Sequence, residues 1–95
     1  MPGYAHGGVL AAALDEAMAL LLYARDEFAL TRRLEVDLRA PAPVGAFVRV
    51  EAELEESDSR SLRLRASAVG EDGRELARAR GVFVRANRPE PWIRP

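Results

Sequence analysis

The residues best suited to chemistry lie close together near the start of the chain, in His6-Gly7-Gly8 and in the carboxylate Asp15 that follows. Two consecutive glycines can open a helix whose first backbone N–H groups a ligand can approach closely. Such a terminus favours negative charge and can stabilise an oxyanion that develops in a reaction. Asp15 lies eight residues after Gly7, a little over two turns along the same helix. The pattern predicts an oxyanion donor and a carboxylate that acts as general base or nucleophile.

The helix around Asp15 is apolar, and the helical neighbours of this residue are Ala11, Met18, Ala19 and Leu22. A carboxylate in such a setting is costly unless it is hydrogen-bonded or faces a cleft. Ordinary roles for the same residues stay open. Asp15 can sit at a rim beside Arg32 or Arg33, Glu16 can be merely solvated, His6 can cap the helix, and the glycine pair can be a plain turn.

The rest of the chain is predicted to be one helix followed by strands. Residues 7 or 8 to about 25 are good helix formers on every face, which predicts a buried helix with its exit at 26–31. Alternating apolar and polar residues then predict strands at 33–39, 48–55, 62–68 and 74–85. Between them lie the proline-rich segment 41–45, a polar turn at 56–60 and a hairpin at 70–73.

The fourth predicted strand has two unlike faces. One face is small and ends in an aromatic ring, with Ala77, Ala79, Gly81 and Phe83, so that the helix can approach it closely. The other face carries Leu76, Arg78, Arg80, Val82 and Val84. Glutamates of the second strand and arginines of the third are expected to pair across the outer face of the sheet. One helix and an antiparallel meander predict an α+β arrangement, a curved sheet wrapped on a central helix.

Length and composition predict a single small domain over residues 1–95, with a lead-in at 1–5 and an extended tail at 87–95. Cysteine is absent and the core is small, so oligomerisation is the expected source of extra stability. The net charge of −1 gives no field that would attract nucleic acid or a membrane surface. The longest apolar run, Ala17 to Ala24, is too short to span a bilayer, and no basic flank marks a signal peptide. We expect a cytoplasmic protein.

Two segments carry a family resemblance. His6, Gly7, Gly8 and Asp15 match the H-G-G-x(7)-D helix-opening motif of the hot-dog thioesterases, in particular the phenylacetate-pathway (PaaI-like) and THEM-type branch. The segment 34–45 resembles the next strand of that family and its R-P-x-P-x-G turn, with alanine in the first position of the turn. The similarity covers residues 4–86.

The resemblance implies a hot-dog fold, in which a long central helix is wrapped by an antiparallel sheet of about four strands. It further implies dimers joined edge to edge, often paired into tetramers, which hydrolyse acyl-CoA thioesters without a metal or a cofactor. Carried over by position, the Gly7 N–H polarises the thioester carbonyl and His6 orders the turn. Asp15 comes from the other subunit, and Thr31, ahead of the first strand, helps to place the water.

By the same resemblance, Gly8 and Glu16 are expected beside the substrate. A side chain introduced at Gly7 should block the substrate with little loss of thermal stability.

This chain departs from the family at its beginning, because family members carry a strand hairpin before the H-G-G turn and this chain starts five residues before His6. Either the fold lacks the two N-terminal edge strands, which we expect to leave one sheet edge open, or the gene start is placed too late. The alternative function is a non-catalytic hot-dog module that binds acyl-CoA or serves only oligomerisation. A hydratase or dehydratase is less favoured, because it needs a carboxylate–histidine pair and the sole histidine precedes the helix.

Overall fold

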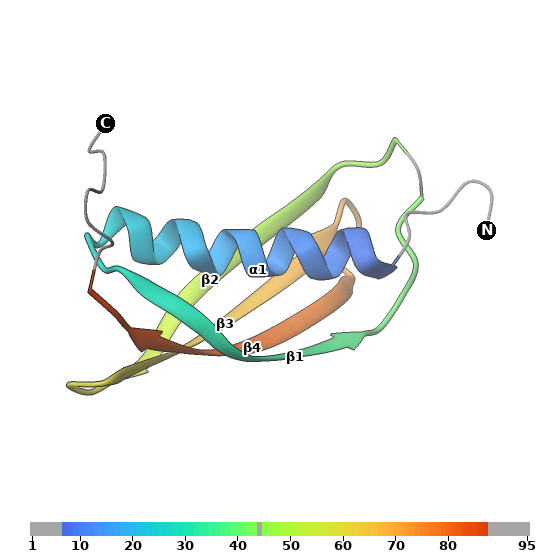
Figure 1. Ribbon diagram of the computed structural model, residues 1–95. Helices are drawn as coiled ribbons and strands as arrows, with labels where there is room; N and C mark the ends of the chain where they lie inside the picture. Colours follow the sequence, from blue (N-terminus) through green and yellow to red (C-terminus); the bar gives the residue numbers. More distant parts are fainter. Residues whose placement is uncertain (1–6, 44, 88–95) are drawn as a thin grey trace.

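The computed structural model describes residues 7–43 and 45–87, which form one helix lying on one sheet (Figure 1). The elements in chain order are α1 (Gly7–Ala24), β1 (Ala29–Leu38), β2 (Val48–Ser57), β3 (Ser61–Gly70) and β4 (Glu75–Arg85). All neighbouring strands are antiparallel, and their order across the sheet is β1-β4-β3-β2. The predicted α+β hot-dog architecture of a helix and four strands is confirmed.

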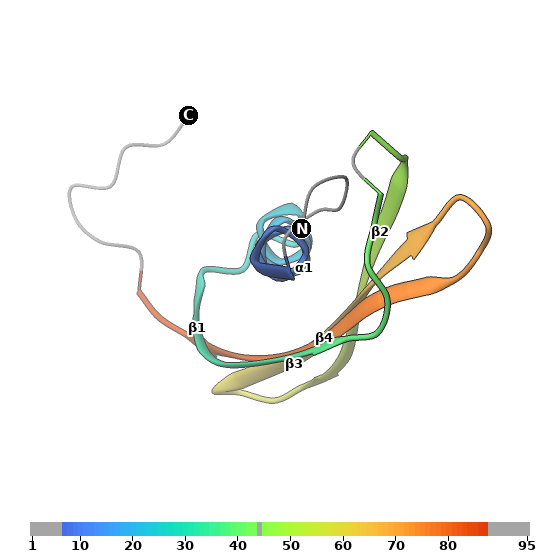
Figure 2. The same ribbon diagram turned by 90° about the vertical axis from the view of Figure 1, so that its right-hand side faces the viewer.

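The sheet curves around α1, so that the helix lies in its concave face (Figure 2). Four helix residues at intervals of four face the sheet and are buried, namely Leu10, Leu14, Met18 and Leu22. They pack against the inward-facing residues of the two central strands, which are Leu62, Leu64, Ala66, Ala68, Ala77, Ala79 and Phe83. A row at intervals of four forms one stripe of a helix, and this stripe fixes the side of α1 that meets the sheet.

The chain leaves α1 through a residue in the left-handed region, two positions after the last helical residue. Asp26 has a φ of 59°, and the N–H of Glu27 donates to the carbonyl oxygen of Leu22 at 2.9 Å. This pattern satisfies carbonyl groups that the last helical turn would otherwise leave unpaired. The helix therefore stops without a glycine, close to the predicted end at about residue 25.

Three strands are longer than the alternation predicts, and β3 gains one residue at its start and two at its end. β1 already begins at Ala29, because Ala29, Leu30 and Thr31 pair with the end of β4, and a bulge follows between Thr31 and Arg33. The prediction that Thr31 precedes the first strand is therefore wrong. β2 continues to Ser57 past a second bulge, so the turn spans only 58–60 rather than 56–60. A bulge shifts the phase of the alternation, so the pattern alone started β1 too late and ended β2 too early.

The small face of β4 is confirmed. A Cβ at Gly81 would lie 2.7 Å from Cε1 of Phe83 and 3.3 Å from Sδ of Met18, so the helix does approach the strand closely here. Leu76, predicted on the opposite face, is instead buried in the core. A register shift between Ala68 and Val69 of β3 lies opposite this end of β4 and turns Leu76 inward.

The outer face of the sheet is charged. Arg65 of β3 pairs with Glu53 of β2, as predicted for these two strands, and Arg49 and Glu51 pair along β2. All four side chains are more than half exposed, so such pairs contribute at most about 1 kcal/mol each. They keep this face hydrated more than they hold the sheet together.

Much apolar surface is left uncovered on the helix and on the edge strand β1. The exposed large side chains are Val9, Leu20 and Tyr23 of α1 and Leu30, Leu34 and Leu38 of β1. Within the described ranges α1 is also the helix long and apolar enough to cross a membrane, at 18 residues with a mean hydropathy of 1.5. The apolar run Ala17 to Ala24, on which the sequence prediction relied, is only the last part of this helix. A single helix of this kind is weak evidence, since the core helix of a water-soluble protein passes the same test. The expected lack of membrane contact and the cytoplasmic location stay predictions.

Candidate functional site

Gly7 is the first residue of α1, as the motif predicts, and is half-buried. A Cβ at this position would lie 2.6 Å from Cδ1 of Leu38, near the end of β1. Positive φ angles occur at Gly45 and Gly73, whereas Gly7 has helical backbone. The lack of a side chain at Gly7 is therefore a matter of space against Leu38. The prediction that a side chain here would hardly affect stability has to be revised.

Asp15 lies in the middle of α1 and is half-buried. Its Oδ1 is buried and accepts no hydrogen bond within the described residues. An unsatisfied buried polar atom costs about 1–3 kcal/mol, so a carboxylate in this state calls for a partner. Neither Arg32 nor Arg33 forms an ion pair with Asp15 in the described ranges, and Arg33 pairs with Glu35 at 3.1 Å instead.

Thr31 lies on β1 directly opposite Phe83 of β4 and is exposed. Phe83 is also near Met18, because both side chains close around Gly81. Met18 follows Asp15 by one turn of the helix, so Thr31 and Asp15 belong to the same half of the molecule. Gly7, which contacts Leu38, belongs to the other half.

Spacing along the helix separates the two predicted catalytic groups of one chain. Eight residues of α-helix advance about 12 Å, so the Gly7 N–H and the Asp15 carboxylate cannot both contact one thioester group. A reacting group held between an oxyanion donor and a base needs both within about 3 Å. If Gly7 and Asp15 act on the same thioester, they must come from two copies of the chain.

The other predicted residues have plainer surroundings. Gly8 and Glu16 are exposed on α1, and Glu16 points about 100° away from Asp15 around the helix. His6 lies outside the described residues, so its capping or ordering role is untested. In residues 7–43 and 45–87, no group of three or more His, Asp or Glu side chains could hold a metal ion.

Sequence reasoning missed a cavity at the end of the sheet where α1 begins. It has a volume of about 460 Å³ and lies between the segment after β1 and the β3–β4 hairpin, with Phe47 and Arg74 among its lining residues. The alternation pattern gave Phe47 no role, because this residue lies between the proline-rich turn and β2. An aromatic residue in a turn segment is the sequence signal that could have drawn attention to it, and in the structure its side chain is 82% exposed.

A second missed feature is an ion pair at the opposite end. The guanidinium of Arg85 and the carboxylate of Glu27 are both largely covered. Nε and Nη2 of Arg85 donate hydrogen bonds of 2.9 and 3.0 Å to the two carboxylate oxygens of Glu27. The hydrogen bond from Arg85 lowers the pKa of Glu27 below its ordinary value. Arg85 also donates to the backbone oxygen of Asp58, so one side chain ties β4 to the helix exit and the β2–β3 turn.

The family follows from comparison with known proteins. Residues 2–77 match the family model described as the thioesterase superfamily. This chain belongs to the thioesterase superfamily. The chain is 32% identical to the phenylacetic acid degradation protein PaaI from Thermus thermophilus, with a TM-score of 0.81, and the match covers 88% of this chain and 71% of that one.

Other matches agree with this assignment. A hypothetical thioesterase from Streptococcus pneumoniae TIGR4, solved with coenzyme A, has the same fold at 15% identity and a TM-score of 0.86, over 90% of this chain and 66% of that chain. Acyl-coenzyme A thioesterase THEM5 from Mus musculus is 31% identical over 84 residues, which are 87% of this chain. The chain spans about a third of the length of that protein, 34%. The family and the fold are therefore shown.

Proposed function

We propose that this chain hydrolyses acyl-CoA thioesters, with Asp15 as its catalytic carboxylate. The observation that carries the proposal is the buried Oδ1 of Asp15, which accepts no hydrogen bond within the described residues. A protein keeps such a costly group where something else completes the site. Membership of the thioesterase superfamily supplies the reaction class, and a curated relative is named acyl-coenzyme A thioesterase.

In the proposed reaction the Gly7 N–H, at the positive end of α1, donates to the thioester carbonyl oxygen and stabilises the oxyanion. As a general base, the carboxylate of Asp15 takes a proton from the attacking water, the C–S bond then breaks, and the proton passes to the CoA thiolate as the free acid leaves. As a nucleophile, Asp15 attacks the carbonyl carbon, the C–S bond breaks to release CoA, and water then hydrolyses the acyl–aspartyl anhydride to the free acid. Thr31, on the same half of the chain as Asp15, helps to place the water.

The proposed active unit is a homodimer, alone or paired into a homotetramer. Gly7 and Asp15 of one chain are about 12 Å apart along the helix, so one thioester would need Gly7 from one copy and Asp15 from the other. The exposed leucines of the edge strand β1 and the exposed apolar face of α1 supply surface that a second copy would cover.

Two single-mutant structures of the pneumococcal thioesterase replace an aspartate and a threonine that are 16 residues apart, the same spacing as Asp15 and Thr31.

The test is thiol release from a panel of acyl-CoAs by the native protein and by Asp15→Asn. We expect the substitution to lower turnover by about 10²–10⁴-fold, the usual contribution of a general base, with fold and assembly unchanged. Glu16→Gln, which removes one carboxylate from the exposed neighbouring position, should lower turnover much less than Asp15→Asn, and a larger effect at Glu16 would shift the catalytic assignment by one residue. Activity of Asp15→Asn within a few-fold of the native value would remove Asp15 from the mechanism. No thiol release from any native sample would favour the non-catalytic module instead.

A further inference from the structure

Leu38 lies where a substrate would approach the start of α1. A Cβ at Gly7 would be 2.6 Å from Cδ1 of Leu38, so this methyl group fills almost the space that a side chain of Gly7 would take. In a helix the Cα–Cβ bond tilts toward the N-terminus, which is also the direction in which the first N–H groups point. The Leu38 side chain therefore stands beside the direction from which a carbonyl oxygen reaches the Gly7 N–H.

The backbone at Leu38 is fixed, whereas its side chain can move. The two residues that follow, Arg39 and Ala40, donate backbone hydrogen bonds of 2.8 and 3.1 Å to the carbonyl oxygen of Leu76. The Leu38 side chain itself is 55% exposed. Because the strand is held in place, only a change of rotamer can alter the space that Leu38 leaves at Gly7.

An apolar row on the inner face of β1 ends at Leu38. Its members alternate along the strand and pair with small residues of β4 that face the helix, and they are Leu34, Val36 and Leu38. The helix packs mainly on the other three strands, so Leu34 and Leu38 stay partly exposed. An apolar acyl group that lies along this row removes apolar surface from water.

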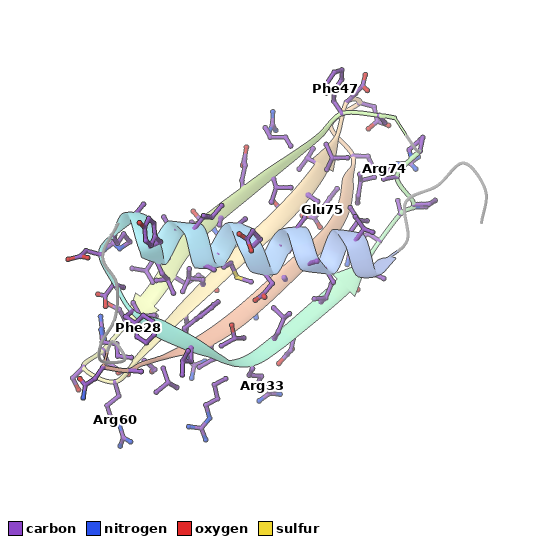
Figure 3. The ribbon with its side chains drawn as sticks, turned by 45° about the horizontal axis from the view of Figure 1, so that its top comes forward. Phe28, Arg33, Phe47, Arg60, Arg74 and Glu75 are labelled. Atoms are coloured by element: carbon purple, nitrogen blue, oxygen red, sulfur yellow. The ribbon has the colours of Figure 1, made fainter. Side chains whose placement is uncertain are left out.

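The surface beyond the end of the row is charged. Nη1 of Arg39 lies 2.9 Å from Oδ2 of Asp37, and Nε of Arg39 lies 3.9 Å from Oε1 of Glu75. Figure 3 shows Glu75 in the half of the molecule where α1 begins, away from Phe28 and Arg60. For a thioester bound at Gly7, the acyl group is therefore expected on the side of the apolar row.

The chemistry of a thioester decides what Leu38 can distinguish. An oxygen that accepts the Gly7 N–H lies about 2.9 Å from the nitrogen, and its carbonyl carbon is about 1.2 Å farther away. Both groups on this carbon, the sulfur and the acyl α-carbon, then lie within reach of the Leu38 methyl groups. The sulfur is unbranched and the CoA arm is the same in every substrate. The α-carbon is therefore the first atom at which acyl-CoAs differ in width.

We propose that Leu38 selects the substrate at its acyl α-carbon, so that this chain prefers thioesters with an unbranched α-carbon. The assignment rests on the proposed function, since it takes the thioester carbonyl to lie at the Gly7 N–H. A branch adds a methyl group where Leu38 already fills the space of a Cβ. One extra carbon in an apolar site changes kcat/KM by about 10–200-fold, and the low end applies because the Leu38 side chain can move.

The experiment compares butyryl-CoA with isobutyryl-CoA, which contain the same atoms and differ only in branching at the α-carbon. The ratio of their kcat/KM values is measured for the native protein, Leu38→Ala and Leu38→Val. Both variants lack the Cδ1 atom that lies at Gly7, and valine suits a strand. We expect the native protein to prefer butyryl-CoA about tenfold or more, and each variant to lose most of that preference.

The matched control is Leu20→Ala. Leu20 is 56% exposed, almost as much as Leu38, and lies thirteen residues after Gly7 on α1, about 20 Å away along the helix. This variant should keep the native ratio. Any difference in the intrinsic reactivity of the two esters is common to all the proteins and cancels in the comparison. Melting temperatures should confirm that all variants fold.

A second measurement does not depend on turnover. The affinities of both esters are measured by calorimetry for Asp15→Asn with and without Leu38→Ala, and their ratio should shift toward the branched ester when Leu38 is shortened. An unchanged ratio in both Leu38 variants, the same shift in Leu20→Ala, equal use of both esters by the native protein or binding of neither ester would overturn the assignment.

Failure of the proposed function looks different. A protein that releases no thiol but whose affinity ratio depends on Leu38 would keep the selection of the acyl group and lose the reaction. Thiol release with a ratio that is indifferent to Leu38 would do the reverse.

Discussion

Substitution of Gly7 can separate two reasons for a glycine at the start of α1. One reason is space, because a Cβ here would lie 2.6 Å from Cδ1 of Leu38. The other is approach of the substrate to the Gly7 N–H. In Gly7→Ala alone both are disturbed, so a loss of activity would not tell them apart. Removing the Leu38 side chain as well gives the new methyl group room and leaves only the second reason.

The structure sets the size of the expected stability changes. Leu38 is 55% exposed and can move, so Gly7→Ala should cost about 1 kcal/mol, the low end of the range for overpacking. Leu38→Ala should cost about 1–2 kcal/mol, because only part of the side chain is buried. In the double variant the two should couple favourably by about 1 kcal/mol, since the clash is gone. For a domain of this size 1 kcal/mol is about 4–8 °C in melting temperature.

The assay is melting temperature together with thioester turnover per folded molecule for the native protein, both single variants and the double variant. If the Gly7 N–H binds the thioester oxygen, the double variant melts at the temperature of Leu38→Ala but stays about 10²–10³-fold less active than that variant. Equal melting temperature and equal activity of these two variants would refute the oxyanion role and leave Gly7 as a packing residue. The donor would then have to be sought elsewhere.

Two further predictions concern assembly and pH. Sedimentation equilibrium at micromolar concentration should show no folded species of 10.4 kDa. Leu34→Asp on the exposed edge strand should dissociate or unfold the assembly, whereas Arg49→Ala on the opposite edge of the sheet should not. A cooperative, stable native monomer would contradict this prediction. Because Arg85 lowers the pKa of Glu27 below 4.5, the ion pair stabilises the fold above that pH and its contribution is lost as the pH falls through the lowered value. Glu27→Gln should therefore melt below the native protein at pH 7, with a gap that closes as the pH falls through the lowered pKa of Glu27. A gap that does not change with pH would mean that the charge of Glu27 is unimportant.

The order of elements could be predicted from the sequence because each element carries a strong local pattern. The helix has apolar formers on all faces, and the hairpin at 70–73 has a glycine at each end, of which Gly73 indeed has a φ of 84°. The predictions that failed are the ends of several strands and the face of β4 on which Leu76 lies. Pairing between distant segments extended β1 back to Ala29, and register shifts turned Leu76 into the core. A local alternation shows neither which distant segments pair nor where a bulge shifts the register.

The candidate site could be predicted only in part, for a related reason. Spacing placed Gly7 and Asp15 on one helix, and their types suggested the chemistry. The pattern could not tell that Leu38 lies against Gly7, because the two residues are 31 positions apart and meet through the fold. For the same reason the cavity at Phe47 was missed, since its walls come from two loops that are distant in sequence.

The arrangement of the proposed site follows from the direction of the helix relative to β1. The helix starts where β1 ends, at Gly7 and Leu38, and Met18, farther along, lies over Gly81, which pairs with the middle of β1 at Leu34. One chain therefore carries its oxyanion donor at one end of α1 and its carboxylate near the middle of the helix. A two-fold axis near the middle of β1 would bring the donor end of each copy toward the carboxylate of the other. Each dimer would then hold two equivalent sites, and separating the copies would abolish both at once without disturbing a single catalytic residue.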